Sequence, residues 1–379
     1  MKLPLSLFPA PAEALLVVLV ALVGCAHRGG EGAGTRTDGA SNPLDDQALF
    51  LAGMGSGGFL AAQRESMGWE THRIRMERMW ERYEEIRGDH VRFWSRSQLG
   101  DLRRSGVIFY PFSGADFLYA NAMFPDASTY LMCGLESCEM LPDLARLSPR
   151  EIAIGLDGIY HSLDSVLYFS YFLTKEMRVD FSRTRLRGVV PPLLVFLARS
   201  GHRIESIRAV GLDRAGKLVS RSADAGAGAP GIHIVARAPG GKEKNIYYFQ
   251  ENLGDGNLAR DRRLFSFAAS RGPAVTYLKS ASYLMHEPGF SLIRDHIVER
   301  SAAVVQDPSG IPFRYFPGVN WDLSLYGDYV GTLDIFSQHH QPDLAAAYRS
   351  CVNHVEAMPF GIGYMSVPGR SSMLVARRK

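Results

Sequence analysis

Residues 106–136 constrain the fold most, because they read as a strand, a turn, a short helix and a second strand. Residues 107–112 are β-branched and aromatic between chain-breaking residues, which predicts a buried strand. Pro125 and Asp126 end a short helix over 117–124, and residues 129–135 predict the second strand. A helix between two strands implies a right-handed crossover, so the strands are expected to be parallel neighbours near the centre of a sheet.

Four residues are expected where these strands end: Ser113, Gly114, Asp116 and Glu136. Ligands of open α/β sheets bind at the carboxyl ends of the strands. Ser113, Asp116 and Glu136 are therefore candidate catalytic residues, and Gly114 and Glu136 are candidates for holding a cofactor. In the structural alternative, which we favour, Asp116 caps a helix, since the turn lacks two of the three glycines of a dinucleotide-binding loop.

The N-terminus carries a second informative pattern. Residues 14–23 form an apolar run after Lys2 that is too short to span a bilayer and is typical of a signal-peptide core. The run ends in Leu22-Val23-Gly24-Cys25, which resembles the lipobox of bacterial lipoproteins. The resemblance implies cleavage before Cys25, a diacylglycerol on its sulfur and a further acyl chain on its amine, which together anchor a protein stably. An ordinary signal peptide, or a chance match in a cytosolic chain, are the alternatives.

These patterns predict a lipoprotein of the bacterial cell envelope. Ala26 after the lipidated cysteine favours the outer membrane, with the folded part facing the periplasm. We divide the chain into a signal peptide (1–24), the lipidated cysteine with a flexible tether (25–46), a helical region (47–105) and an α/β body (106–379). A long helix is expected over 61–94, broken at Gly88, with His72 on its solvated face.

The body combines several further patterns. A period of two at about 204–250 predicts a β-meander. A second strand-helix-strand unit is expected over 274–306, and a C-terminal hairpin between 358–366 and 372–376. The predicted fold class is α/β, a mixed sheet with a central parallel βαβ unit, a meander insertion and a C-terminal hairpin.

The first βαβ unit with Glu136, together with the terminal hairpin, resembles class I methyltransferase-like Rossmann folds over roughly a third of the chain. The glycine-rich loop of that family is incomplete here, and nucleotide cofactors are scarce outside the cytoplasm, so we expect no cofactor. The strings YPFSGADFLYANAMFP, YLKSASYLMH and QDPSGIPFRYF resemble an uncharacterised bacterial envelope family, a resemblance that implies no activity.

Metal and disulfide sites are weakly indicated. His339, His340, Cys351 and His354 are metal-ligand types, but their spacing matches no closed site, so we expect no metal. Asp157, His161 and Asp164 recur at helical spacing and are expected to form an exposed polar face. Cys133 and Cys138 are a possible disulfide in an oxidising envelope, and two unpaired thiols are the alternative.

The net charge of +3 over 379 residues, without a basic run, gives no reason to expect a nucleic-acid partner. Aromatic residues over 311–336 either line a glycan groove or plug the core, and we favour the plug. The favoured function is a non-catalytic module that binds a ligand, an envelope protein or a glycan. The alternative is an extracytoplasmic hydrolase or transferase at the edge of strand 107–112, which would need a pocket with perturbed acids there.

Overall fold

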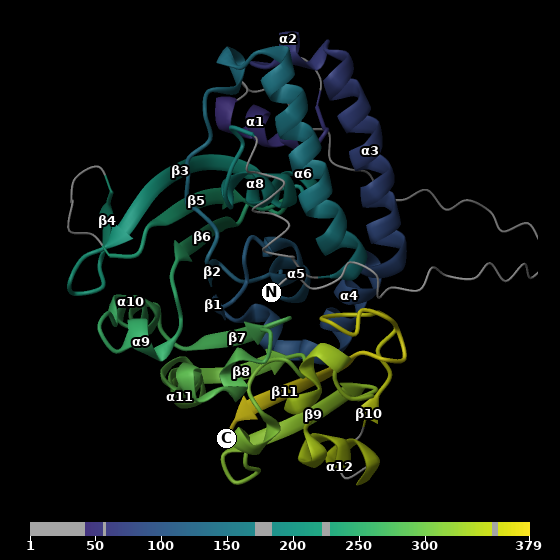
Figure 1. Ribbon diagram of the computed structural model, residues 1–379, viewed down its shortest axis with the longest axis vertical. Helices are drawn as coiled ribbons and strands as arrows, with labels where there is room; N and C mark the ends of the chain where they lie inside the picture. Colours follow the sequence, from purple (N-terminus) through teal and green to yellow (C-terminus); the bar gives the residue numbers. More distant parts are fainter. Residues whose placement is uncertain (1–41, 56–57, 171–183, 222–227, 351–354) are drawn as a thin grey trace, which may run out of the picture. The chain divides into compact units, whose positions relative to one another are not determined.

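The predicted unit over 106–136 forms the centre of the sheet. A computed structural model describes residues 42–55, 58–170, 184–221, 228–350 and 355–379. Strand β1 (Val107–Tyr110), helix α5 (Phe117–Met123) and strand β2 (Thr129–Gly134) follow one another, and β1 pairs in parallel with β2. The described strands form an eleven-stranded mixed sheet in the order β10-β9-β11-β8-β7-β1-β2-β6-β5-β3-β4 (Figure 1). The predicted α/β class and its central parallel unit are confirmed.

The second strand-helix-strand unit lies directly beside the first. It consists of β7 (Ala274–Leu278), α11 (Ser291–Arg300) and β8 (Ser301–Gln306), and β7 pairs in parallel with both β1 and β8. On the other side, β2 pairs in parallel with β6 (Glu243–Gln250). Because these strands are parallel, their carboxyl ends lie at one edge of the sheet.

Strands form over the predicted range of about 204–250, but they do not pair as a simple meander. Strand β3 (Arg203–Leu212) pairs with both β4 (Leu218–Ser220) and β5 (Gly231–Arg237), so β4 lies at the edge and β5 returns to the other side of β3. The reason is length: β4 has three residues, whereas the ten-residue β3 offers β5 a full ladder of hydrogen bonds.

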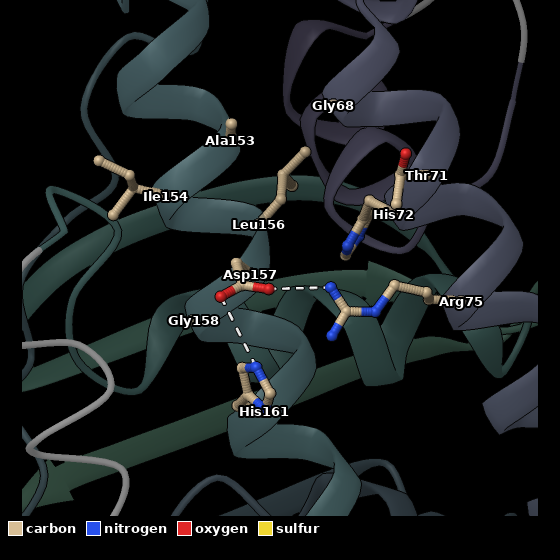
Figure 2. Close-up of a pocket in the computed structure, with 10 residues that line it drawn as sticks. All are labelled: Gly68, Thr71, His72, Arg75, Ala153, Ile154, Leu156, Asp157, Gly158 and His161. Atoms are coloured by element: carbon tan, nitrogen blue, oxygen red, sulfur yellow. Dashed lines mark hydrogen bonds and ion pairs between the residues drawn. The ribbon is translucent and has the colours of Figure 1, made fainter.

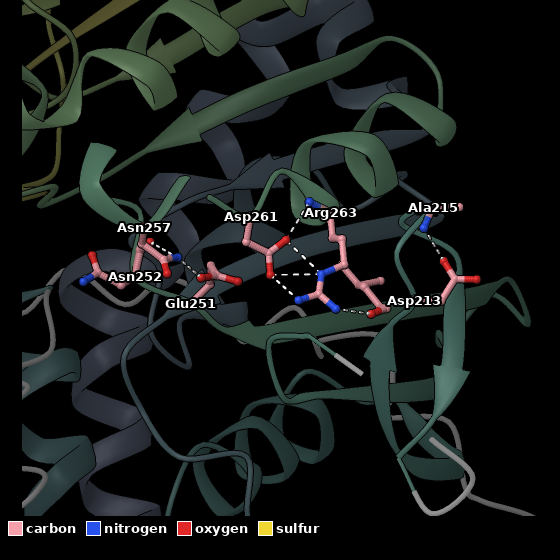
Figure 3. Close-up of polar contacts among 8 residues, drawn as sticks. Asp213, Ala215, Glu251, Asn252, Asn257, Asp261 and Arg263 are labelled. Atoms are coloured by element: carbon pink, nitrogen blue, oxygen red, sulfur yellow. Dashed lines mark hydrogen bonds and ion pairs between the residues drawn. The ribbon is translucent and has the colours of Figure 1, made fainter. Parts of the chain in front are cut away.

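A polar cluster fastens the connection after β6 to the end of β3 (Figure 3). Arg263, at the start of α10 (Arg263–Ser270), pairs with Asp261 at 2.5 Å and donates to the Leu212 carbonyl oxygen at 3.3 Å. Glu251 accepts from the Asn257 amide in α9 (Asp255–Leu258). Backbone and side-chain partners satisfy these groups, so we assign the cluster a structural role.

The C-terminal hairpin prediction is wrong in its pairing. Strand β11 (Ser372–Arg378) lies between β8 and β9 (Trp321–Gly327) and is antiparallel to both, whereas β10 (Val355–Glu356) pairs with β9. Residues 358–366 contain only an isolated bridge between Ile362 and Met365. A Cβ atom on Gly361 would lie 1.9 Å from the Ser366 carbonyl oxygen, so this segment folds back on itself instead of extending beside β11.

Helices cover both faces of the sheet. One core packs under α1 (Pro43–Leu51), α3 (Met67–Tyr83), α6 (Pro149–Phe169) and α8 (Val190–Arg199), and the other under α9, α10, α11 and α12 (Pro342–Ser350). Strand β1 alternates between them, since Ile108 and Tyr110 enter the first core and Phe109 the second. In Figure 1, α3 and α6 run side by side over the first core. No helix in the described part of the chain is long and apolar enough to cross a membrane.

Three helical predictions need correction. Helix α1 begins at Pro43, inside the predicted tether, because the Asn42 side chain caps it by accepting from the Leu44 N–H at 3.0 Å. Gly88 does not break the long helix, because the π-helical turn Glu84–Gly88 joins α3 to α4 (Asp89–Trp94). His72 is buried at 3% exposure instead of solvated, since its Nε2 atom lies 2.8 Å from the Leu51 carbonyl oxygen of α1.

Helix α6 begins at a capping box. Ser148 and Glu151 form it around Pro149, which takes the first helical position. The α-helix ends at Phe169, because Ser170 adopts a left-handed conformation.

Candidate functional site

The most strained part of the described backbone lies at the carboxyl edge of the parallel strands. Within the described ranges, five residues other than glycine have left-handed backbone with φ between 55° and 67°: Phe112, Ser170, Ser280, Ser282 and Tyr283. Phe112 follows β1 and the last three follow β7, while Ser170 is joined to them because its carbonyl oxygen accepts from Lys279. Each such residue costs about 1–2 kcal/mol, and strain of this kind concentrates at functional sites. This edge is therefore the candidate site.

A buried ion pair forms the floor of the edge. The Lys279 Nζ atom lies 2.7 Å from Asp116 Oδ2, and both side chains are 2% exposed. Asp116 Oδ2 also accepts from the Tyr110 hydroxyl at 2.8 Å, while Oδ1 accepts from the Tyr119 N–H at 3.1 Å and caps α5. Burial raises the pKa of the Asp116 carboxyl and lowers the pKa of the Lys279 amine.

A second buried carboxylate holds the strained turn at 280–283. Asp307, directly after β8, accepts from the Ser280 N–H at 2.8 Å and from the Ser309 N–H at 2.9 Å. The Ser309 hydroxyl in turn accepts from the Ala281 N–H at 2.8 Å. Gly363 closes over this carboxylate, because a Cβ atom there would lie 1.9 Å from Asp307 Oδ2. The turn is thus fixed by side chains from two strand ends and the C-terminal loop.

Two hydroxyl groups beside this network have no hydrogen-bond partner among the described residues. They belong to Tyr277, whose ring lies 4.7 Å from that of Tyr110, and to Ser280. His286 Nε2 is a third buried atom of this kind. Buried polar atoms without partners are rare and mark places where water or a ligand completes a network. The edge is therefore equipped to receive a polar group.

Aromatic rings continue the edge outward. We call Tyr283, His286, Phe336, His339 and Tyr364 the aromatic–histidine surface. Tyr283 stacks on His339 at 5.2 Å and 4°, and the Phe336 and Tyr364 rings lie 5.1 Å apart. The Tyr364 hydroxyl donates to the Ser280 carbonyl oxygen at 3.1 Å, which ties the surface to the strained turn. Phe336, His286 and Tyr364 are half-buried and present ring area to solvent.

The aromatic segment at 311–336 divides between the core and the aromatic–histidine surface. Phe316 and Trp321 are buried in the core beneath α9 to α12, as the plug interpretation predicts. Phe336 instead joins the aromatic–histidine surface. The segment therefore contributes to the core and to the candidate site.

The predicted site residues lie at the carboxyl ends of β1 and β2, and contacts within the fold occupy them. The Ser113 hydroxyl donates to the Cys133 carbonyl oxygen at 3.2 Å. Glu136 accepts from the Tyr248 hydroxyl at 2.7 Å and lies over Gly114, where a Cβ atom would be 3.4 Å from its Oε1. Asp116 is the helix cap that the structural alternative predicts.

The candidate metal ligands His339 and His340 have different contacts. His339 belongs to the aromatic–histidine surface and lies 3.5 Å from Glu287, whereas His340 stacks on Tyr329 at 5.8 Å. Cys351 and His354 lie outside the described residues. Within the described ranges, no group of three or more histidine, cysteine or acidic residues has an arrangement that holds a metal.

The two described cysteines match one of the two alternatives considered for them. Cys133 and Cys138 are free thiols in the structure, as the alternative of two unpaired thiols predicts. The sheet separates them, because Cys133 enters the core under α9 to α12 and Cys138 enters the other core, where its thiol donates to the Pro230 carbonyl oxygen at 3.4 Å. Cys25 lies outside the described residues.

Sequence reasoning missed Lys279 and Asp307, although both stand in the strings YLKSASYLMH and QDPSGIPFRYF. The signal available was a charged residue at the end of a predicted buried strand, with a serine one residue after Lys279 and two residues after Asp307. Comparisons of the chain with models of protein families, with curated proteins and with solved structures found no match. The candidate site therefore depends on its geometry alone.

Proposed function

We propose that the chain is a lipid-anchored protein of the bacterial envelope whose folded part binds a glycan at the carboxyl edge without converting it. Cys25 carries the acyl chains in this proposal. The observation that carries the binding role is the aromatic–histidine surface, which Tyr364 links to Ser280, whose hydroxyl has no hydrogen-bond partner among the described residues. Such a function needs no cofactor and no metal.

The chemistry of a sugar matches this combination. A sugar ring has an apolar face bordered by hydroxyl groups, and aromatic rings such as Phe336 and Tyr364 offer a flat apolar platform. The hydroxyl groups of the sugar find a donor and an acceptor in the Ser280 hydroxyl, which forms no hydrogen bond within the described residues. Asp307 and Ser309 hold the turn in place before a ligand arrives, which lowers the entropic cost of binding.

Replacement of Phe336 with alanine is expected to weaken glycan binding about fivefold to tenfold, because stacking area on the sugar is lost. The measurement is co-sedimentation of the protein with insoluble peptidoglycan, followed by titration with soluble N-acetylglucosamine oligomers. Phe93→Ala is the matched control, since Phe93 is 67% exposed on α4, outside the aromatic–histidine surface. Equal losses in the two variants, or no binding by the unmodified chain, would refute the binding role.

Replacement of Cys25 with serine is expected to abolish acylation and to move the protein from the membrane fraction to the soluble fraction. A serine oxygen at this position does not replace the cysteine sulfur as the acceptor of diacylglycerol. Intact mass and membrane fractionation measure the outcome, and Cys138→Ser is the control because that thiol is buried in the fold. A Cys25→Ser protein that remains acylated would contradict the anchor.

One observation favours a catalytic second candidate, an extracytoplasmic hydrolase or transferase at the same edge. Asp116, Lys279 and Asp307 are buried ionisable groups with displaced pKa values, and such groups cluster at active sites. Chromatography of a bound glycan after long incubation distinguishes the two functions. Release of products that Asp307→Asn prevents, with binding retained, would establish the enzyme, whereas an unchanged glycan supports the binding module.

A further inference from the structure

A groove outside the carboxyl edge lies between α3 and α6 (Figure 2). Its volume is about 660 Å³, within the range of small-molecule sites, and a second hollow of about 290 Å³ continues from it and shares Arg75. Gly68 brings the two helices together at one end, since a Cβ atom there would lie 3.3 Å from the Ala153 Cβ. Figure 2 shows His72 and Arg75 on α3 facing Asp157 and His161 on α6.

The second hollow is rich in arginine. Arg75, Arg78 and Arg82 come from α3, and tyrosines from α6 provide flat supports for two of them. The Arg75 guanidinium lies 3.7 Å from the centre of the Tyr160 ring, and that of Arg82 lies 4.9 Å from the Tyr168 ring. A guanidinium held against a ring keeps its N–H groups directed outward, in the fork that matches phosphate.

These arginines differ in their partners. Arg75 pairs with Asp157 at 2.8 Å, and Asp157 also lies 3.6 Å from His161 Nε2. Arg78 and Arg82 are exposed and form no ion pair within the described part of the chain. Positive charge in the hollow is thus available to an anionic ligand, while Asp157 holds Arg75 in position.

His72 adds an acceptor to the groove. Its Nε2 atom lies 2.8 Å from the Leu51 carbonyl oxygen, so this nitrogen carries the proton. The other nitrogen, Nδ1, is then a hydrogen-bond acceptor, and it has no partner among the described residues. Burial lowers the pKa of the His72 imidazole to about 4, which keeps the ring neutral near pH 7. A ligand here therefore needs a hydroxyl or another donor as well as a negative charge.

We propose that this groove is a binding site for a glycerophosphate group, free in solution or as the headgroup of a lipid. The phosphate binds to Arg78 and Arg82, and a hydroxyl of the glycerol donates to His72 Nδ1. Along α3, Arg78 is six residues and about 9 Å beyond His72, while Arg82 is ten residues and about 15 Å beyond it. Arginine side chains on a helix point back toward its N-terminus, so Arg78 is the arginine nearer to His72 and Arg82 contacts the phosphate from its far side. This site is independent of the glycan proposal, since it uses other helices and other residues.

Calorimetric titration of the full chain with glycerol 3-phosphate tests the proposal. Arg78→Ala is expected to lower the affinity about tenfold or more, because a charge-assisted pair is lost. Arg73→Ala is the matched control: Arg73 also lies on α3, with 43% of its side chain exposed, but it pairs with Glu70 at 2.6 Å, and its loss is expected to change affinity less than about twofold. His72→Gln keeps an N–H donor to the Leu51 carbonyl oxygen but has no acceptor nitrogen at the Nδ1 position, so it is expected to weaken the binding of glycerol 3-phosphate and to leave the binding of inorganic phosphate unaffected.

A second arm identifies the source of the ligand. Vesicles of phosphatidylcholine with and without phosphatidylglycerol are mixed with the Cys25→Ser chain, so that acylation at Cys25 does not contribute. Binding of glycerol 3-phosphate in solution assigns a free ligand, and binding only of phosphatidylglycerol vesicles assigns a headgroup, provided that Arg78→Ala reduces either one. No binding in both arms, or equal effects of Arg78→Ala and Arg73→Ala, would overturn the proposal, while failure of the glycan assay leaves it unaffected.

Discussion

Replacement of Lys279 with methionine is expected to lower the free energy of unfolding by about 3–5 kcal/mol, the largest effect predicted for a single side chain. The substitution leaves Asp116 buried at 1% exposure without its cation. It also removes the contact of the lysine Nζ with the Tyr119 ring, whose centre lies 3.9 Å away. Asp116→Asn is expected to cost a similar amount, because it leaves the ammonium of Lys279 buried and unpaired.

The double variant Lys279→Met with Asp116→Asn is expected to recover most of this loss. Asparagine keeps an oxygen that accepts from the Tyr119 N–H, so α5 retains its cap, and no charge remains buried. Urea unfolding of the four proteins at pH 7 gives the coupling free energy of the pair. Glu70→Gln serves as the control, since its exposed pair with Arg73 is expected to contribute less than about 1 kcal/mol. Single variants that cost less than about 1 kcal/mol, or losses that simply add, would contradict a coupled buried pair.

The Lys279–Asp116 pair also shows which parts of the fold can be predicted from sequence and which cannot. Local patterns predict local structure, because the residues that determine it are neighbours along the chain. The strand at 107–112, the Asp116 cap and the Ser148 capping box all follow from short-range spacing, and the structure contains each of them. The parallel pairing of β1 with β2 follows as well, since a short crossover permits few alternatives.

The candidate site was harder to predict from sequence, because its residues come into contact only when strands from separate strand-helix-strand units pair. Lys279 reaches Asp116 only because β7 lies beside β1, and Asp307 reaches Ser280 only because β8 lies beside β7. The burial of His72 has the same origin, as it depends on α1 packing against α3. Hydrophobic periodicity places a residue on a face of a helix, but it does not identify the element that covers that face.

The neighbours of β3 illustrate the same limit in the sheet. Four strands were predictable from their alternating pattern, but the order in which they pair was not. The short β4 pairs with one edge of β3 and the longer β5 with the other, and the number of hydrogen bonds that each pairing forms is a property of the assembled sheet.

Acidification from pH 7.5 to pH 5 is expected to destabilise the protein substantially, because histidines buried in the neutral form must gain a proton. His72 and His202 are buried, and burial lowers the pKa of each from 6.5 to about 4. Between these values the unfolded chain binds more protons than the folded one, so stability falls as pH falls through this window. Each histidine contributes a loss of about 2 kcal/mol at pH 5.

Other titratable groups also change the loss of stability between pH 7.5 and pH 5. His286 and His296 also have pKa values lowered by burial to about 4, and they add a smaller loss because both are partly exposed. Asp116 and Asp307 act in the opposite direction, since burial raises the pKa of each carboxyl and the folded chain then gains protons first. A single pH titration therefore measures a sum, and a variant is needed to isolate one histidine.

His72→Gln isolates the contribution of His72. Glutamine does not titrate, and it keeps a donor for the Leu51 carbonyl oxygen, so the loss of stability between pH 7.5 and pH 5 is expected to be about 2 kcal/mol smaller than in the unmodified chain. Urea unfolding at the two pH values measures both losses. His90→Gln is the control, because His90 is exposed on α4 and its replacement is expected to leave the loss unchanged. An unchanged loss in His72→Gln would mean that His72 is solvated or already charged, and it would remove the neutral acceptor on which the glycerophosphate site depends.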